Sequence, residues 1–416
     1  MEYQPRVIDA EVANRLESAG AIVLEGPKGC GKTETARRVA ASEVLLDTDT
    51  AARALADVDP TLLLEGSTPR LLDEWQIVPP VWNAVRREVD KRGLPGQFVL
   101  TGSATPTDDI SRHTGAGRFS RLRMRPMSLF ESGNSTGSVS MADVLAGARV
   151  AARESTNDIR ATLGFIARGG WPLGQALNLR AAMTANRDYL DQIRRTDLTA
   201  ADGVRRDPQR LGRLFQSLAR NVATAASITT IATDVGEADS PLDRDTAREY
   251  LAALERLMVV EDQPAWQPHL RSKYRLRLGA KRHFVDPCLA VAALRSSPEQ
   301  LVKDLQFAGM LFESMVIRDL RTYSQPLDGT VYYYLDNAGL EVDAVVDDGA
   351  GSWAAFEVKL GTSQIDTAAA SLLKFRDRID TTKSGQPRAL VVIVPNGYGY
   401  LRPDGVSVVP ITALGP

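Results

Sequence analysis

The feature that most constrains the fold is a glycine-rich segment between an apolar, strand-like run and a helix-like stretch. Its residues are Gly26, Pro27, Lys28, Gly29, Cys30, Gly31, Lys32 and Thr33. The segment matches GxxxxGK(S/T) at every fixed position and in the required context. The glycines allow backbone amides to surround phosphate oxygens, and the helix start adds partial positive charge. We therefore predict that residues 26–33 bind ATP, with Lys32 on the β- and γ-phosphates and Thr33 on Mg²⁺. The alternative is a chance glycine-rich turn.

The first 130 or so residues alternate between short apolar runs and helix-like stretches. The apolar runs lie at 21–25, 43–47, 70–74 and 97–103, with a fifth at 121–127. Strands that alternate with helices indicate a parallel sheet covered on both faces. We therefore expect an α/β fold for this part of the chain.

An acidic pair, Asp73 and Glu74, ends the third apolar run. We expect Asp73 to hold Mg²⁺ through water and Glu74 to orient or activate the attacking water. Such a pair is common by itself, and its position about forty residues after the phosphate loop favours this role. Thr101 and Ser103 end the next run and are candidates for contacting the γ-phosphate or its water. The alternative for these two is an ordinary turn after a strand.

A single arginine, Arg118, lies just before the fifth apolar run. It is a candidate arginine finger that stabilises transition-state charge at a neighbouring subunit's nucleotide. That role requires a homo-oligomer. The alternative is a solvent-exposed arginine without a catalytic role.

The middle of the chain, from about 141 to 282, has mostly helical patterns. Three of them, at 211–224, 227–236 and 243–260, precede a hairpin expected from the runs 259–266 and 273–278. Three helices followed by a hairpin have the outline of a winged helix. The basic residues that alternate near this hairpin indicate either a wing on a DNA backbone or a charged edge strand. They are Arg271, Lys273, Arg275 and Arg277, followed by Lys281 and Arg282.

The last part of the chain, from about residue 299, returns to mixed structure. It begins with one long amphipathic helix at 300–323. Strands are expected at 331–336, 340–348, 353–360 and 388–395, with a helix at 371–379.

Four charged side chains in this part form a second candidate site. Glu357 and Lys359 are two residues apart on one strand and share a face. If Asp343 ends the preceding strand, its carboxylate meets that of Glu357, and Glu313 on the long helix adds a third. Such carboxylates can hold Mg²⁺ or Mn²⁺, with Lys359 stabilising charge in a nuclease-like reaction. The alternative is the charged, wet face of an antiparallel sheet.

Bulk composition excludes several classes of protein. The formal net charge of -2 demands neither nucleic acid nor an anionic membrane as partner. The two cysteines, Cys30 and Cys288, have no metal-ligand spacing, which suits a reducing compartment. No window approaches the roughly 18 apolar residues that cross a bilayer, and the first residues do not form a signal peptide. We expect a cytoplasmic protein of two or three domains without a membrane partner.

Taken in order, the segments GPKGCGKT, LLDEWQ, VLTGS, GAGRF, GGWPL, EVDAV and FEVK resemble a known family. This family comprises the bacterial and archaeal AAA-type ATPases with a C-terminal domain of unknown function. The resemblance implies an AAA-like ATPase domain at 1–131, a helical and winged-helix region at 141–285, and a domain similar to the PD-(D/E)XK (restriction-endonuclease-like) nucleases at 299–416. It gives the Walker roles to Lys32, Thr33, Asp73 and Glu74, and the nuclease-like positions to Glu313, Asp343, Glu357 and Lys359. Gln76 also fits the family's pattern, although Trp75 is bulkier than expected there.

Two hypotheses about function follow from this reasoning. In the first, ATP hydrolysis drives action on DNA, with or without metal-dependent cleavage by the C-terminal domain. In the second, ATP controls oligomerisation or a partner protein, and the nuclease-like domain is a non-catalytic platform.

Overall fold

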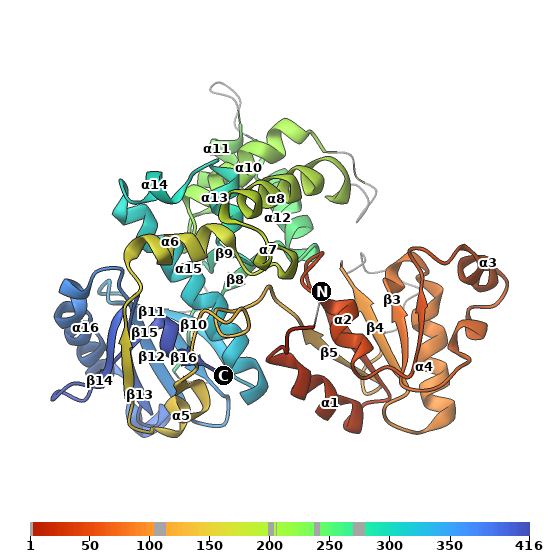
Figure 1. Cartoon of the computed structure of the whole chain (residues 1–416), viewed down its shortest axis with the longest axis horizontal. Helices are drawn as coiled ribbons and strands as arrows, with labels where there is room; N and C mark the ends of the chain where they lie inside the picture. Colours follow the sequence, from red (N-terminus) through yellow and green to blue (C-terminus); the bar gives the residue numbers. More distant parts are fainter. Residues whose placement is uncertain (1–2, 104–113, 199–203, 205, 237–241, 269–278) are drawn as a thin grey trace. The chain divides into compact units, whose positions relative to one another are not determined.

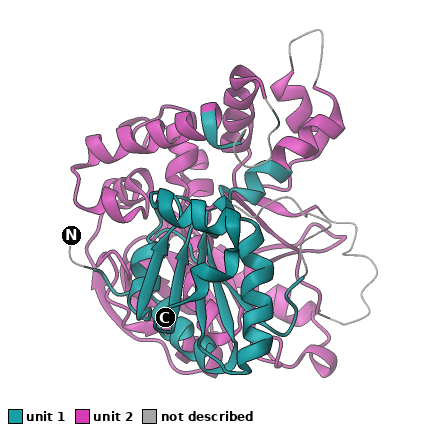
Figure 2. Cartoon of the chain, turned by 90° about the vertical axis from the view of Figure 1, so that its right-hand side faces the viewer, with its two compact units in different colours: residues 1–126, 196–205, 252–259 teal, residues 127–195, 206–251, 260–416 magenta. Residues whose placement is uncertain are grey.

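The computed structural model describes residues 3–103, 114–198, 204, 206–236, 242–268 and 279–416. The chain divides into two compact units, which Figure 2 colours separately. Unit 1 contains residues 1–126, 196–205 and 252–259. Unit 2 contains residues 127–195, 206–251 and 260–416.

Unit 1 is built on a five-stranded parallel sheet with the spatial order β2-β3-β4-β1-β5 (Figure 1). The strands are β1 (Ala21–Glu25), β2 (Ser42–Leu45), β3 (Arg70–Asp73), β4 (Phe98–Gly102) and β5 (Phe119–Arg123). The helices that accompany them are α1 (Ile8–Ser18), α2 (Lys32–Arg37), α3 (Thr50–Val58) and α4 (Pro80–Arg92). The predicted parallel α/β sheet is therefore confirmed, with its fifth strand slightly earlier than expected.

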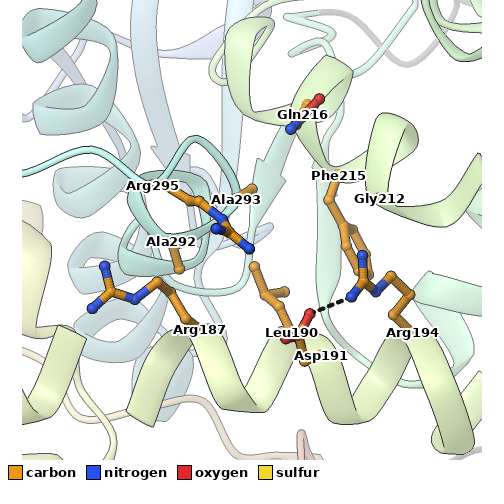
Figure 3. A pocket seen from close by; sticks show the side chains of 10 residues that line it. All are labelled: Arg187, Leu190, Asp191, Arg194, Gly212, Phe215, Gln216, Ala292, Ala293 and Arg295. Carbon is orange, nitrogen blue, oxygen red and sulfur yellow. Dashed lines mark ion pairs between the residues drawn. The ribbon is translucent and has the colours of Figure 1, made fainter. Parts of the chain in front are cut away.

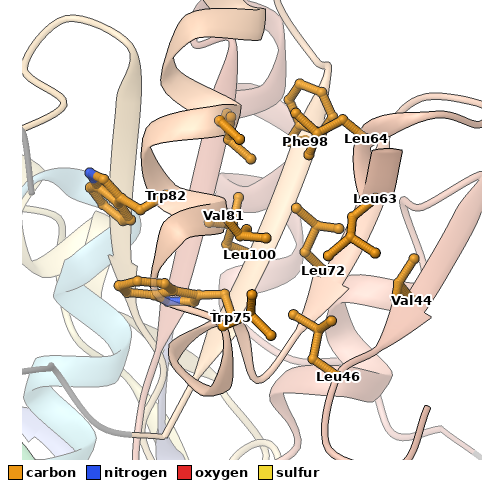
Figure 4. Close-up of a cluster of buried hydrophobic side chains, with 14 of the residues drawn as sticks. Val44, Leu46, Leu63, Leu64, Leu72, Trp75, Val81, Trp82, Phe98 and Leu100 are labelled. Carbon is orange, nitrogen blue, oxygen red and sulfur yellow. The ribbon is translucent and has the colours of Figure 1, made fainter. Parts of the chain in front are cut away.

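Both faces of this sheet are buried, which explains why its strands are continuous apolar runs. Ala21 and Val23 belong to one buried cluster, whereas Ile22 and Leu24 belong to another. Figure 4 shows the first cluster, in which the rings of Trp75 and Trp82 lie 4.9 Å apart.

The strand order decides where the functional residues meet. β4 lies between β1 and β3, and all three strands run in the same direction. Their carboxyl ends therefore share one edge of the sheet. The phosphate loop follows β1, Asp73 ends β3, and Thr101 lies at the end of β4.

The helical part of unit 2 includes three successive helices followed by a two-stranded antiparallel sheet. The helices are α10 (Pro208–Arg220), α11 (Ile228–Val235) and α12 (Arg244–Arg256), the last of which continues into residues assigned to unit 1. β8 (Val260–Gln263) pairs with β9 (Lys281–Phe284). The strand expected at 273–278 lies outside the described residues, and the observed partner of β8 begins at Lys281 instead.

Other helices of this part are α6 (Ile159–Arg168), α7 (Pro172–Gln175), α8 (Leu179–Gln192), α13 (Cys288–Ala293) and α14 (Pro298–Leu301), which contacts α6. Asn178 caps α8 by accepting a hydrogen bond from the amide of Ala181. A π-helical turn, Ile193–Asp197, follows α8.

The second sheet has seven strands in the order β10-β11-β12-β13-β15-β14-β7. They are β10 (Thr330–Leu335), β11 (Glu341–Asp347), β12 (Trp353–Val358), β13 (Ala389–Val394), β14 (Gly397–Leu401), β15 (Ser407–Pro410) and β7 (Ala152–Ser155). A small parallel pair joins β6 (Val139–Ser140) to β16 (Leu414–Gly415). β6 and β7 come from the segment expected to be mostly helical, so the second sheet draws on residues far apart in the sequence.

The helices around this sheet are α5 (Met141–Ala146), α15 (Leu305–Ser324), α16 (Ile365–Arg378) and α17 (Thr381–Ser384). The long helix expected at 300–323 is present as α15, but it begins at Leu305, because a turn at residues 302–304 separates it from α14. The Asp304 carboxylate accepts a hydrogen bond from the amide of Phe307 and caps α15. α16 packs its residues Leu372 and Phe375 into the apolar cluster of the sheet.

Candidate nucleotide site and carboxylate–lysine cluster

The phosphate loop adopts a backbone that glycine permits. Gly29 and Gly31 have φ angles of 72° and 108°, in the left-handed region that side chains disfavour. A Cβ atom added to Gly26 would lie 2.3 Å from the carbonyl oxygen of Met124. The three glycines are therefore explained by the geometry of the loop itself.

Lys32 holds its ammonium group against the loop. Its Nζ donates to the carbonyl oxygens of Gly26, at 2.9 Å, and Pro27, at 3.0 Å. The residue is buried, with only 5% of its surface exposed. An ammonium has three donors, so this position leaves it able to donate to phosphate oxygens at the loop.

Thr33 and Asp73 meet as the sequence predicts. The Thr33 hydroxyl donates to Asp73 Oδ1 over 2.9 Å, and the buried Thr101 hydroxyl donates to the same oxygen. Burial raises the pKa of Asp73, and the two hydroxyl donors oppose this shift. These hard oxygen ligands at the edge of the sheet suit Mg²⁺, so the residues present fit the expected ion.

Glu74 is oriented by Thr101 and Ser103 at the end of β4 and by Gln76 in the turn after β3. Its backbone is left-handed, with φ of 53°, and its amide donates to Thr101 Oγ1 over 3.2 Å. Its Oε2 accepts hydrogen bonds from the Ser103 hydroxyl, at 2.9 Å, and from the Gln76 amide. Thr101 and Ser103, expected to face the γ-phosphate, thus position the two acidic residues. The family resemblance includes Gln76, but no spacing in the sequence predicts its contact with Glu74, which depends on the fold.

Two further residues that the sequence predicts for the nucleotide site, Arg118 and Lys28, form ion pairs in unit 1. Arg118 precedes β5, at the amino edge of the sheet, and its Nε donates to Asp90 over 2.8 Å. Its guanidinium is therefore at the opposite edge from the phosphate loop of its own subunit. Lys28 pairs with the buried Asp197 over 2.7 Å, a contact that nothing in the spacing of these residues indicates.

The C-terminal charged residues also meet, but in pairs with lysines. Lys359 Nζ donates to Glu357 over 2.5 Å and to Asp343 over 3.2 Å. Asp343 also accepts from the amide of Val358, and Glu357 accepts from the Ser371 hydroxyl. Burial, followed by the charge of Asp343, raises the pKa of Glu357 to about 8.

Glu313 has a lysine partner, Lys281, that no spacing in the sequence indicates. Lys281 on β9 donates to Glu313 over 2.8 Å and lies 2.6 Å from Glu341. Lys281 is buried, so it is neither a wing residue nor the solvated edge expected from its basic neighbours. Burial opposes its charge, but Glu313, Asp343 and Glu341 outweigh burial and raise the pKa of Lys281. Burial and the charge of Asp343 raise the pKa of Glu313 to about 8.

The expected metal site at Glu313, Asp343 and Glu357 remains a prediction, and in the structure each of these carboxylates contacts a lysine. Within residues 3–103, 114–198, 204, 206–236, 242–268 and 279–416, no group of three or more His, Cys, Asp or Glu side chains is placed to hold a metal ion. Lys281 and Lys359 supply positive charge to these carboxylates. The basic residues Arg271, Lys273, Arg275 and Arg277 lie outside the described residues.

A buried polar network joins β8 and β9 to this cluster. Gln263 donates through Nε2 to the carbonyl oxygens of Tyr332 and Asp343, so its Oε1 faces His283 Nε2 at 3.1 Å. The other His283 nitrogen, Nδ1, lies 3.1 Å from the Ser314 hydroxyl. Burial lowers the pKa of His283, which keeps it neutral. The network fixes the strand that carries Lys281 against the second sheet.

Comparison with known proteins supports the N-terminal part of this description. Residues 18–132 match the family described as AAA domain. Residues 161–300 and 308–414 match two domains of unknown function, DUF8612 and DUF4143. The chain thus carries an AAA-type P-loop ATPase domain.

Relatives of the whole chain are distant. Uncharacterized proteins of Mycobacterium bovis and Mycobacterium tuberculosis are each 25% identical over 416 residues, covering 99% of this chain and 84% of their own. A Walker-type ATPase of Pyrococcus abyssi is similar at a TM-score of 0.42 and 11% identity, over 69% of this chain and 94% of its own. In the described part of the chain, every helix is too short or too polar to cross a membrane.

Proposed function

We propose that this chain is a Mg²⁺-dependent ATPase whose active site is the carboxyl edge of the unit 1 sheet. The observation that carries the proposal is the contact of Thr33 with Asp73, beside a loop that holds Lys32. It places an ammonium, an oxygen ligand pair and an oriented carboxylate, Glu74, on one edge of the sheet.

Each of these residues has a distinct task in the proposed reaction. Lys32 and the loop amides bind the β- and γ-phosphates, and Thr33 and Asp73 hold the ion, directly or through water. Mg²⁺, when bound, neutralises charge on the phosphate oxygens. Glu74 orients a water and accepts its proton as the oxygen bonds to the γ-phosphorus. The bond from that phosphorus to the bridging oxygen breaks, and ADP and phosphate leave.

An ATPase assay tests the proposal directly. Phosphate release with Mg²⁺ is compared for the natural chain, Lys32→Ala and Glu74→Gln. We expect loss of nucleotide binding in the first variant, and retained binding with lost turnover in the second. Lys91→Ala, an exposed lysine of the same unit, is the matched control. Natural protein that fails to bind ATP with Mg²⁺ would refute the assignment.

For the C-terminal cluster, the observation that supports the second hypothesis is the position of Lys281 beside Glu313. A buried ammonium already neutralises Glu313, and Lys359 does the same for Asp343 and Glu357. We therefore propose that this domain is a non-catalytic platform in which lysines take the place of a metal ion. ATP binding then controls assembly or a partner, as the second hypothesis states.

This part is tested with Lys281→Met and divalent manganese. In an Asp73→Asn background, which disables the N-terminal ion site, we expect Mn²⁺ to raise the melting temperature of Lys281→Met only. Lys383→Met removes an exposed lysine of unit 2 and is the control. Cleavage of DNA by the natural chain with Mg²⁺ or Mn²⁺, abolished in Lys359→Ala, would overturn the platform proposal.

DNA binding and oligomerisation are separate proposals with their own tests. The order α10, α11, α12, β8 and β9 supports a winged-helix-like DNA contact, which salt-dependent binding to duplex DNA tests. Arg118 acts in trans only if a neighbouring subunit brings its nucleotide to the amino edge of the sheet. In that case, mixing Arg118→Ala with Lys32→Ala subunits restores ATPase activity that neither variant has alone. Mixtures without activity would remove the arginine finger from the proposal.

A further inference from the structure

A small, arginine-lined pocket lies in the helical part of unit 2. It has a volume of about 110 Å³ and is bounded by α8, α10 and the end of α13 (Figure 3). Three guanidinium groups line it, from Arg187, Arg194 and Arg295, together with one carboxylate, Asp191. These four groups give the pocket a formal charge of +2. None of them belongs to the nucleotide site or to the carboxylate–lysine cluster.

Arg194 is held at the pocket with part of its hydrogen-bonding capacity unused. Its guanidinium pairs with Asp191 over 2.8 Å, as the dashed line in Figure 3 marks. Its buried Nε has no hydrogen-bond partner among the residues that the structure describes. Gly212 on α10 makes room for this side chain, because a Cβ there would lie 3.2 Å from a terminal nitrogen of Arg194. A guanidinium carries five N–H donors, and the ion pair with Asp191 engages its Nη2.

Arg295 lines the pocket, and its own backbone is in a strained, left-handed conformation. It follows α13 with φ of 52°, the left-handed position at which helices usually end in glycine. The amide of Ser296 donates to Val291 and that of Arg295 to Ala292, which completes a Schellman turn. An exposed arginine in this strained position is explained if its guanidinium has a ligand. In Figure 3, Leu190 and Asp191 lie between the side chains of Arg295 and Arg194.

The charge of the pocket lining indicates which ligands suit it. Guanidinium groups bind phosphate oxygens in paired, parallel hydrogen bonds, and a dianion matches the formal charge of the lining. Leu190 and Phe215 form an apolar part of the lining.

We propose that this pocket is a binding site for a phosphate dianion, either inorganic phosphate or the terminal group of a small phosphomonoester. Arg194 and Arg295 bind its oxygens, Arg187 adds charge at one side, and Asp191 limits the affinity by competing for Arg194.

Calorimetric titration with inorganic phosphate and with glycerol phosphate tests the site. All proteins carry Lys32→Ala, so that the phosphate loop does not contribute and failure of the proposed ATPase leaves this test intact. We expect saturable binding that Arg295→Gly weakens at least tenfold. Because glycine suits the left-handed backbone, this variant keeps or raises the melting temperature. Asp191→Asn strengthens binding by releasing Arg194, and Arg376→Ala, an arginine of α16, leaves binding unchanged.

The two ligands distinguish the source of the phosphate. Binding of both supports a site for any phosphate dianion, and binding of one identifies the free ion or the monoester. The proposal is overturned if neither ligand binds saturably, or if Arg376→Ala weakens binding as much as Arg295→Gly. It is also overturned if only DNA, whose phosphates are diesters, binds in an Arg295-dependent way.

Discussion

Thr101 gives the sharpest test of how the nucleotide site is positioned. This fully buried hydroxyl donates to the Asp73 carboxylate and accepts from the amide of Glu74. Thr101→Val keeps the shape of the side chain and removes both hydrogen bonds. Since Thr101 bonds to both acidic residues, the change should lower kcat of ATP hydrolysis more than it weakens nucleotide binding.

The expected magnitude follows from the charge of the acceptor. A hydrogen bond to a charged group contributes about 1.5–3 kcal/mol. If that energy is lost in the transition state, kcat falls roughly 10- to 150-fold. Thr101→Ser restores the hydroxyl and should recover most of the rate.

The pH profile provides a second readout of the same variant. Burial raises the pKa of Asp73, while the Thr101 hydroxyl lowers it. Activity requires the ionised carboxylate and is lost as the pH falls through this pKa. Thr101→Val should therefore move the acidic limb of the kcat profile to higher pH. An unchanged kcat with an unchanged acidic limb would refute the positioning role of Thr101.

Three further predictions concern unit 2. Lys281→Met leaves Glu313 buried without its cation. At a pH above the raised pKa of about 8, where the carboxyl is ionised, this should lower the free energy of unfolding by about 3–5 kcal/mol, with part of the loss recovered by adding Glu313→Gln; urea denaturation at such a pH, followed by tryptophan fluorescence, measures both. The pKa values of Glu313 and Glu357 are raised to about 8, so these groups bind protons in the folded state that the unfolded chain has released. Stability should therefore fall as the pH rises from about 4.5 to about 8, and Glu313→Gln should flatten the dependence of the urea midpoint on pH. Asp304→Ala removes the cap of α15 and should cost about 0.5–2 kcal/mol in the same assay, whereas a midpoint equal to that of the natural chain would contradict the capping role.

The N-terminal unit was predictable because its site residues follow strand ends. Asp73 and Thr101 are each the end of an apolar run, and parallel strands bring such ends to one edge. What the sequence could not provide was the direction of the contacts there. Whether the Thr101 hydroxyl faces phosphate or Asp73 depends on the separation of β3 and β4, which no local pattern contains.

For the C-terminal cluster, the sequence predicts which acidic residues come together but not all of the lysines that they contact. Glu357 and Lys359 share a face because of the strand period, and the structure brings both to Asp343. Lys281 could not be assigned to this cluster, because the pairing of β8 with β9 and the His283 network determine its position. Its neighbours along the chain are basic, which made a solvated strand the natural interpretation.

The two acidic sites differ in the source of their positive charge. This difference predicts that Mg²⁺ binds at the first site and not at the second. At Asp73, the carboxylate is bonded by two neutral hydroxyls, so its negative charge remains available to an ion from solution. At Asp343 and Glu313, the positive charge is covalently part of the chain, as Lys359 and Lys281. A divalent ion must displace an ammonium at the second site but not at the first. Mg²⁺ should therefore raise the melting temperature of the natural chain with ATP present, and Asp73→Asn alone should abolish that effect.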